Sequence, residues 1–526
     1  MSNNESGKMI RCFFTQLEDD DKWQCTCGVK RSQSLKAGYT NLRTHLNKEH
    51  AGWEDEARII LKEQSGQKSI TAFASTTSKG RNIFNWLEWV IMDNLPLSFV
   101  EKELTRKNTN LLEVGTKTLM KYVLELRKRV ETCIIQELPE HFGLVTDGWS
   151  EKSTHYTALF AAFEKNSQLE TPLLALSPPS DEEHYDKHMQ YTLIIDCVSK
   201  YHRTIDSILY LTADNAPVNP ATSDLLRVPF IGCASHRFNL VVRDFLRDSE
   251  ETLQKVHNLM RLLCTLKQGG KLRKVTALQP VLRNKTRWSS THEMIKRFFR
   301  LEPFLDKDDA HIAEHMPSPA EVVRLKKLQA QMEILESATK SLQETKLSLS
   351  DVRSIFEIVN ELIELPPSAA RYLDVNQPNT ISHSPAFENA IVKVIDGDVA
   401  GLTTEEKATL KKFEYGTEPA LSRVTSTSTS NFAERVALKK QRIMGQGSAY
   451  KDLTHIPPTS NICERLFSGV RLVLTDYRKR MGPYTMESLM FLKANRKYWD
   501  EKLVSDMVSK VKITEEDLEE LEYPTE

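Results

Sequence analysis

Residues 141–150, HFGLVTDGWS, contain the stretch that decides the fold class. A short apolar run at 142–145, preceded by Pro139 and followed by Gly148, predicts a buried β-strand. We expect Asp147 to lie at the carboxyl end of this strand. Because open α/β sheets bind their ligands at the carboxyl ends of strands, Asp147 is the first candidate functional residue.

The residues that follow predict a mixed sheet. Residues 156–164, YTALFAAFE, and 171–176, TPLLAL, are strand candidates at hairpin distances, which favours an antiparallel meander over an all-parallel sheet. A helix-like segment at 191–201 then leads to another apolar run, SILYLTA at 207–213, which ends at Asp214. We therefore expect one sheet to present Asp147 and Asp214. Two convergent carboxylates suit a divalent ion such as Mg²⁺, which keeps coordination positions open for phosphate.

Length and composition limit the class of protein. A chain of 526 residues is too long for one hydrophobic core and predicts several domains. The sequence contains no apolar run of about 18 residues and no signal-peptide core at its start, so we expect a protein made in the cytosol without a membrane partner. Eight scattered cysteines indicate reduced thiols rather than a disulfide framework.

The net charge of −1 conceals an uneven distribution. Residues 22–50 hold six basic residues and one acid, whereas residues 514–526 hold seven acids and no base. A basic amino-terminal segment indicates a polyanionic partner, and an acidic terminus indicates a solvated tail.

Residues 22–53 carry the pattern of a small zinc-binding unit. Cys25 and Cys27 lie on a predicted β-like turn, and His45 and His50 end a predicted helix with four residues between them. Two thiolates and two imidazoles form a closed tetrahedral zinc site of the structural kind. The single residue between the cysteines is an unusually narrow gap. The alternative is a chance arrangement of Cys and His on a surface segment.

The same segment carries bases that would neutralise DNA phosphates, with the helix around residues 41–46 facing a groove. These bases are Lys30, Arg31, Lys36, Arg43 and Lys48. Trp23, Gly38 and Leu42 are better interpreted as the core of the unit.

Residues 54–80 are polar and predict a linker, and residues 81–138 predict helices. Bases at 117–129 could contact DNA or form a solvated helix face. Beyond Asp214, residues 230–236, FIGCASH, predict a strand that ends in a Cys233-x-x-His236 pair. A second zinc site lacks two further ligands at useful spacing. We expect His236 to contact a scissile phosphate, and the alternative is a packed core histidine.

Two later segments also contain candidate residues. In 284–297, NKTRWSSTHEMIKR, Arg287 could hold a phosphate and Trp288 could stack on an unpaired base, although Trp288 could equally be core. Residues 457–468, PPTSNICERLFS, predict the start of a helix with Glu464 in its first turn. A favourable interaction with the helix dipole explains an acid in this first turn as well as metal binding does. The spacing between Glu464 and the other two acids in the sequence does not decide between these explanations.

Several motifs resemble those of hAT-superfamily (hobo/Activator-like) DNA transposases and occur in the same order. They are TDGWS at 146–150, LTADNA at 211–216, CASH at 233–236, TRWSST at 286–291 and SNICERLFSGV at 460–470. The likeness extends from about residue 82 to about residue 500, and residues 22–53 resemble a BED-type zinc finger.

This resemblance implies an RNase H-like α/β core with a mixed sheet, interrupted by a large helical insertion. The implied order is a finger at 11–53, a linker at 54–80, a helical DNA-binding region at 81–138, the first part of the core at 139–250, the insertion at 251–450, the end of the core with a dimerisation region at 451–500, and an acidic tail at 501–526.

The resemblance also implies a function. Asp147, Asp214 and Glu464 would bind two Mg²⁺ or Mn²⁺ ions, and Arg287 with Trp288 would hold a flipped base during hairpin formation on flanking DNA. The partners would be double-stranded DNA, as transposon ends and target, and further copies of the chain, and the location would be the nucleus. Abundant apolar residues at 466–499 favour a dimer interface. The alternative is a domesticated, catalytically silent DNA-binding regulator.

Overall fold

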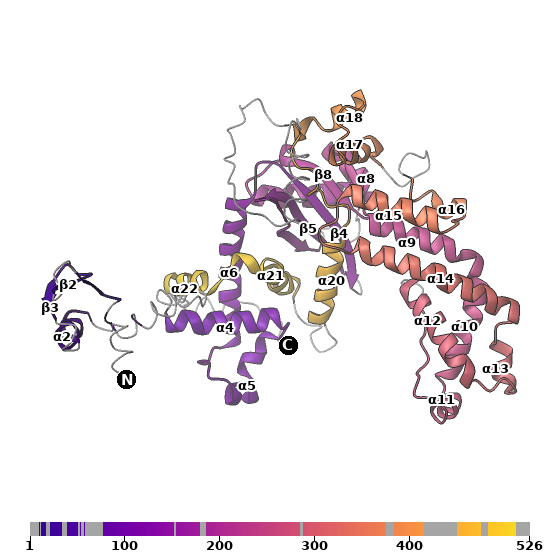
Figure 1. The fold of residues 1–526 in the computed structure, drawn as a ribbon, viewed down its shortest axis with the longest axis horizontal. Helices are drawn as coiled ribbons and strands as arrows, with labels where there is room; N and C mark the ends of the chain where they lie inside the picture. The colour runs from indigo at the N-terminus through magenta and orange to yellow at the C-terminus, as the bar shows by residue number, and fades with distance from the viewer. Residues whose placement is uncertain are drawn as a thin grey trace. The chain divides into compact units, whose positions relative to one another are not determined.

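The computed structural model describes residues 10, 12–16, 22–33, 39–50, 53, 57, 77–151, 154–178, 186–284, 288–374, 383–414, 450–474 and 482–511. The chain divides into two compact units (Figure 1). The first contains residues 1–128 and 496–522, and the second contains residues 129–495 and 523–526.

The amino-terminal part of the first unit is a small sheet with one helix. Strands β1 (Phe14–Gln16), β2 (Lys22–Cys25) and β3 (Lys30–Ser32) pair antiparallel in that order, and α2 spans Thr40–Glu49. Alternation along β2 buries Trp23 and Cys25 against Leu42 and Leu46 of α2. These contacts confirm Trp23 and Leu42 as core residues, and Gly38 lies outside the described residues.

The rest of the first unit is helical. Its elements are α4 (Ser78–Met92), η2 (Leu97–Glu101), α5 (Glu103–Asn108), the beginning of α6 (Thr116–Glu137), η8 (Arg496–Tyr498) and α22 (Glu501–Lys510). Helix α22 packs on α4, where the Thr77 backbone N–H donates to Ser505 Oγ at 2.9 Å and Arg81 pairs with Glu501 at 2.8 Å.

This packing changes two predicted boundaries. The predicted linker ends before residue 80, because Thr77 caps α4 by accepting a hydrogen bond from the Gly80 backbone N–H. The predicted tail at 501–526 begins with an ordered helix, because α22 buries Val504, Met507 and Val508. The strongly acidic residues 514–526 lie outside the described residues.

The second unit is built on a six-stranded mixed sheet with the order β6-β5-β4-β8-β9 and β7 paired to β5. The strands are β4 (Phe142–Glu151), β5 (Thr154–Lys165), β6 (Gln168–Glu170), β7 (Leu173–Ser177), β8 (Ile208–Ala213) and β9 (Phe230–Gly232). Strands β4 to β7 pair antiparallel, whereas β4–β8 and β8–β9 are parallel, so the predicted mixed sheet is confirmed. Helix α7 (Lys187–Lys200) and η3 (Ile205–Ser207) lead into β8.

Strand β4 is longer than the sequence predicts, and Asp147 lies within it rather than at its end. The cause is β5, whose ladder with β4 continues past the apolar run from Gly143↔Ala162 to Glu151↔Thr154. Strand β9 is shorter than predicted, because the chain turns into a helix at Ala234 and places His236 on that helix.

A helical core follows the sheet. Its elements are α9 (Ala234–Leu246), η4 (Arg247–Ser249), α10 (Glu250–Leu263), α11 (Leu266–Arg273), α12 (Trp288–Leu301), η5 (Glu302–Phe304), α13 (Ala310–His315), α14 (Pro319–Leu342), α15 (Leu349–Leu362) and α16 (Pro367–Ala370). Helix α8 (Val218–Leu226) instead connects β8 to β9. Helices α9 to α16 share one apolar cluster around Phe238, Phe298 and Phe356. This cluster begins at α9, before the predicted insertion start at residue 251.

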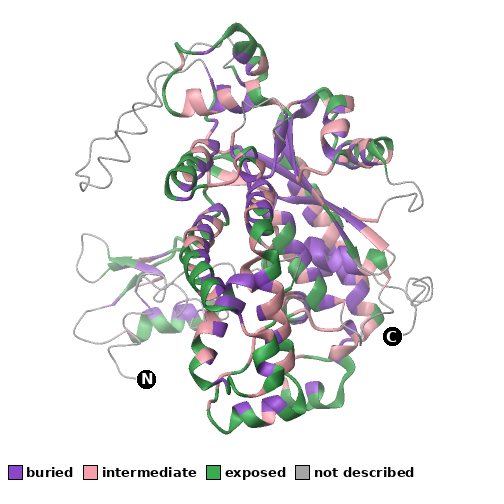
Figure 2. Cartoon of the chain, turned by 90° about the vertical axis from the view of Figure 1, so that its right-hand side faces the viewer, coloured by how far each residue is buried: buried purple, intermediate pink, exposed green. Residues whose placement is uncertain are grey.

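The predicted insertion does not form one helical body in the described residues. Helices α17 (Pro385–Ile395) and α18 (Thr404–Thr409), with η6 (Lys411–Phe413), pack on sheet residues instead. Their shared cluster includes Phe387 and Ile391 of α17, Tyr210 of β8 and Ile231 of β9. Figure 2 shows the sheet strands in the buried colour among these helices.

Helices α20 (Asn461–Val473) and α21 (Pro483–Ala494) complete the second unit. Asn495, at the end of α21, accepts a hydrogen bond from Leu173 N at 3.0 Å and donates one to Leu173 O at 2.9 Å. Within the described residues, no helix combines the length and apolar character that a membrane span requires.

A dimer interface at 466–499 stays a prediction, although most of the apolar surface that favours it is covered within the single chain. Most of the residues on which it relied are buried within the single chain: Leu466, Phe467, Val470, Met486, Leu489, Met490, Leu492 and Trp499. Leu472 is the exception in that set with large exposure, at 64%. Among the described residues of this range, 466–474 and 482–499, burial within the chain explains most of the apolar side chains.

Candidate acidic site and zinc site

Strand register brings Asp147 and Asp214 together. The parallel ladder pairs Leu144 with Leu211 and Val145 with Thr212, and β8 ends one residue later at Ala213. Continuing this register by two residues aligns Asp147 with Asp214. Both side chains also fall on the same face of the sheet, because side chains alternate with a period of two.

Helix α20 brings Glu464 to the same face. Trp149 lies two residues beyond Asp147 in β4, and its ring stacks on Phe467 of α20 at a centroid distance of 5.9 Å. Glu464 precedes Phe467 by three residues, so both lie on adjacent turns of one side of the helix. Arg471, two turns beyond Glu464, lies over the Trp149 ring at 5.7 Å.

Two hydrogen bonds fix the chain that enters α20. Thr212 Oγ1 of β8 donates to Pro457 O at 3.1 Å, and the Ser460 backbone N–H donates to Cys233 Sγ at 3.3 Å. These bonds join the start of α20 to the sheet edge that holds Asp214. The fold therefore brings Glu464 near Asp214, although the two residues are far apart in the sequence.

Asp214 and Glu464 are both close enough to Asp147 to affect its pKa. The pKa of Asp147 is raised to about 7, first by burial and then by the negative charge of Asp214, with a smaller contribution from Glu464. A hydrogen bond of 2.8 Å from the Gly148 backbone N–H opposes this rise. Mutual repulsion in a partly buried site is the condition that a bound cation relieves.

The surroundings of Asp214 orient its carboxylate. Its Oδ1 accepts from the Ala216 backbone N–H at 3.1 Å and from the Asn219 side chain, which also donates to Asp214 O. Asn219 is itself held by Gln190, which donates to it at 2.7 Å. The Asn215 side chain does not contact Asp214 in this way, because its amide lies against Gly232. A Cβ at position 232 would overlap Asn215 Oδ1.

Cys233 and His236 lie at the turn that follows β9. Cys233 is fully buried, and burial raises the pKa of its thiol. Its Sγ accepts the Ser460 hydrogen bond, and Cys233 belongs to no group of three or more potential metal ligands in the described residues. His236 is half-buried in the first turn of α9.

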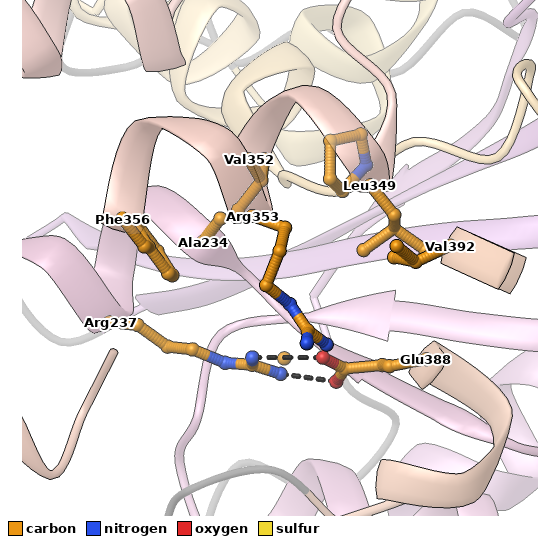
Figure 3. Close-up of a pocket in the computed structure, with 10 residues that line it drawn as sticks. Ala234, Arg237, Leu349, Val352, Arg353, Phe356, Glu388 and Val392 are labelled. Atoms are coloured by element: carbon orange, nitrogen blue, oxygen red, sulfur yellow. Dashed lines mark hydrogen bonds and ion pairs between the residues drawn. The ribbon is translucent and has the colours of Figure 1, made fainter. Parts of the chain in front are cut away.

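An ion pair that sequence reasoning missed lies beside this turn. Arg237 donates from both terminal nitrogens to Glu388 of α17, and the two side chains are 4% and 3% exposed (Figure 3). The pair lines a small pocket with Ala234 and Phe356. No sequence signal links Arg237 to Glu388, since helical period does not relate residues 151 positions apart.

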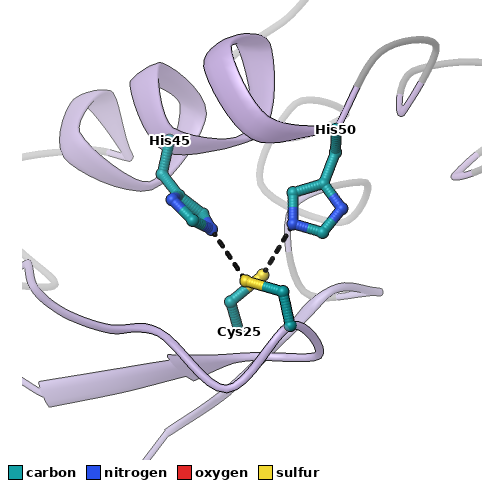
Figure 4. A group of neighbouring side chains, drawn as sticks. Cys25, His45 and His50 are labelled. Carbon is teal, nitrogen blue, oxygen red and sulfur yellow. Dashed lines mark hydrogen bonds between the residues drawn. The ribbon is translucent and has the colours of Figure 1, made fainter.

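The amino-terminal Cys and His residues form one cluster (Figure 4). Within the described residues, Cys25, Cys27, His45 and His50 are the one group of three or more Cys, His, Asp or Glu side chains placed to hold a metal ion, with ligand atoms all within 4.8 Å of one another. Asp147, Asp214 and Glu464 do not form such a group. Cys25 Sγ is 3.4 Å from His50 Nε2, and Cys27 Sγ is 3.3 Å from His45 Nε2. Tetrahedral zinc with ordinary bond lengths separates S and N by about 3.6 Å.

The narrow Cys-x-Cys gap is explained by the turn. Gly28 has φ +89° and its N–H donates to Cys25 O at 2.8 Å, which folds Cys27 back beside Cys25. The pKa of Cys27 is lowered to about 6, chiefly by hydrogen bonds from Val29 and His50. Burial raises the pKa of Cys25 instead. The set fits a zinc ion because two sulfur and two imidazole nitrogen ligands converge at nearly the separations that tetrahedral zinc requires.

The predicted DNA-binding residues lie at different places. Lys30 and Arg31 are exposed on β3, and Arg43 and Lys48 are exposed on α2. Trp288 begins α12, half-buried against the helical core. Lys36 and Arg287 lie outside the described residues.

A family model for the ZBED1 RNase-like helical domain matches residues 231–331. This range begins in β9 and includes α9 to α13 and the first part of α14, which contribute to the helical core. No curated protein sequence matches the chain. Over these residues, the chain is similar to the helical domain of a protein family derived from hAT transposases.

Proposed function

We propose that this protein is a DNA transposase of the hAT type, with an RNase H-like catalytic core and a helical insertion. The observation that carries the proposal is the strand register, which aligns Asp147 of β4 with Asp214 just after β8, while Phe467 of α20 stacks on Trp149 and brings Glu464 to the same face. The charges of Asp214 and Glu464 both raise the pKa of Asp147. Acids placed in this way suit a site for hard divalent cations.

In this proposal, Asp147, Asp214 and Glu464 hold Mg²⁺ or Mn²⁺. Two such ions supply activation of the attacking oxygen and stabilisation of the leaving oxygen during phosphodiester cleavage and strand joining. Asn219 keeps the Asp214 carboxylate oriented through the hydrogen bond described above. His236, in the adjacent turn, contributes a donor to the scissile phosphate.

The zinc-binding cluster supports a BED-type finger that binds double-stranded DNA in the nucleus. Its exposed bases Lys30, Arg31, Arg43 and Lys48 neutralise phosphates, and Lys36 extends the same basic segment. Transposon ends and target DNA are the proposed partners. We propose a homodimer or larger homo-oligomer from the motif resemblance alone.

Arg287 and Trp288 are proposed to hold a flipped base while a hairpin closes on the flanking DNA. The position of Trp288 at the first residue of α12 leaves its ring half-exposed. Its packing on the helical core supports the alternative, in which Trp288 is a structural residue. Stacking on an aromatic plane offsets base unstacking by about 1–3 kcal/mol.

The competing function is a domesticated DNA-binding regulator without catalysis, because the helical-domain match and the zinc cluster fit both functions. Purified full-length protein incubated with labelled duplexes of its own terminal repeats distinguishes them. A transposase cuts these duplexes only with Mg²⁺ or Mn²⁺, and Asp214→Asn abolishes cutting while duplex binding persists. Binding without metal-dependent cutting by the wild type would establish the regulator instead.

A further inference from the structure

Three arginines surround one buried carboxylate at the carboxyl end of α9. Asp244 is 2% exposed, and its Oδ1 accepts from Arg243 Nε at 3.2 Å and from Arg247 Nη2 at 2.7 Å. Arg371, which follows α16, places Nη2 at 3.7 Å from Asp244 Oδ2. Tyr372 donates to the same oxygen at 3.4 Å and lies beneath the Arg371 guanidinium at 4.7 Å.

The number of arginines exceeds what the carboxylate requires. Arg237 and Glu388, which lie earlier on the same helix and on α17, form a buried one-to-one pair. Asp244 instead gathers three guanidinium groups, which leaves two positive charges uncompensated within the cluster. The nearby acid Glu250 is paired with both terminal nitrogens of Arg283.

The arginines are also exposed, unlike Arg237. Their side chains are 62%, 64% and 44% exposed for Arg243, Arg247 and Arg371. A guanidinium has five N–H donors, and the contacts with Asp244 and Tyr372 use a minority of them. Asp244 therefore orients three guanidinium groups while most of their donors face solvent.

We propose that this cluster, Arg243, Arg247 and Arg371 anchored by Asp244, binds the phosphodiester backbone of duplex DNA. Guanidinium groups match phosphate oxygens in shape and charge, and anchoring on a buried carboxylate lowers the entropy lost on binding. Contacts of this kind position a duplex without reading its sequence. The inference rests on the proposed action on DNA, but it assigns a separate surface on α9 and the segment after α16.

Salt dependence of duplex binding by the full-length protein tests the proposal. Arg243→Gln, Arg247→Gln and the double variant each leave Asp244 at least one arginine, which limits the loss of stability. The probe is a 30-base-pair duplex of unrelated sequence. Each lost phosphate contact should reduce the slope of log K against log salt by about 0.9, and the double variant should lose about 1.8.

Matched controls separate a local contact from a change in net charge. Lys307→Gln and Lys340→Gln remove one charge each from exposed lysines that pair singly with Glu302 and Glu336. These should keep the wild-type slope, and Arg247→Lys should largely restore it. A folded double variant with the wild-type slope, or an equal loss in the controls, would overturn the proposal alone. A wild type that binds no duplex would overturn it together with the proposed function.

Discussion

The raised pKa of Asp147 should make the free energy of unfolding depend on pH. Because its pKa is raised from 3.8 to about 7, the folded protein holds a proton between these pH values that the unfolded chain releases. The free energy of unfolding of the metal-free protein should therefore fall as pH rises from about 4 to about 7, by at most about 4 kcal/mol from this group. Asp147→Asn removes this penalty, so the variant should be more stable than the wild type at pH 8.

Urea unfolding in magnesium-free buffer at pH 5 and pH 8 measures this effect. Asp186→Asn is a control of opposite sign, because hydrogen bonds from Met189 and His188 lower the pKa of that capping carboxylate. A stability change for Asp147→Asn that is equal at both pH values would contradict the raised pKa.

At the residue scale, some functional residues and contacts could be predicted from the sequence and others could not, for a physical reason. Asp147 and Asp214 could be found because each follows a short apolar run in the sequence, and the zinc ligands could be found because their spacing is local. The pairing of Arg237 with Glu388 and the gathering of arginines on Asp244 could not. Arg237 and Glu388 lie 151 residues apart and Arg371 lies 127 residues from Asp244, so only the packed fold relates them.

At the scale of elements, local pattern located strands and helices better than it located their ends. Strand β4 continues past Gly148 because β5 supplies a partner through Glu151, and a single-strand pattern contains no information about a partner. Helix α22 was not predicted, because residues 501–526 were interpreted as an acidic tail. Its apolar residues Val504, Met507 and Val508 nevertheless recur at helical spacing.

The finger is the element that depends most on its metal. A unit of this size buries too little apolar surface to fold alone, whereas zinc contributes about 10–16 kcal/mol in comparable peptides. The full chain should carry one zinc ion, measured by atomic emission. Cys27→Ser should lose it and unfold the finger, while Cys264→Ser, at an exposed cysteine of the second unit, should retain it. Full zinc content in Cys27→Ser would exclude this ligand.

At the scale of the whole molecule, residues 496–511 belong structurally to the amino-terminal unit. A chain that ends at Asp500 loses α22, and with it three buried apolar side chains and the Arg81–Glu501 pair. The helices of the first unit should lose on the order of 5 kcal/mol. Hydrogen exchange of α4 measures the loss, and a chain that ends at Val511 serves as the control. Unchanged exchange in the shorter chain would show that α22 is dispensable.

The boundary of the helical region could be located only from the packing of the whole fold. Helical period runs through most of residues 239–414, but one part builds its own core from α9 to α16 and another packs on β8 and β9. Periodicity reports that a face is apolar, not which surface covers it.

The central claim is that Asp147, Asp214 and Glu464 form one divalent-cation site. Mn²⁺ titration of the full-length protein, followed by electron paramagnetic resonance, tests it most directly, because the measurement needs neither DNA nor catalysis. Asp147→Asn, Asp214→Asn and Glu464→Gln should each weaken Mn²⁺ binding at least about tenfold, equivalent to about 1.4 kcal/mol, with zinc content unchanged. Wild-type Mn²⁺ affinity in Glu464→Gln would separate α20 from the site and contradict the account.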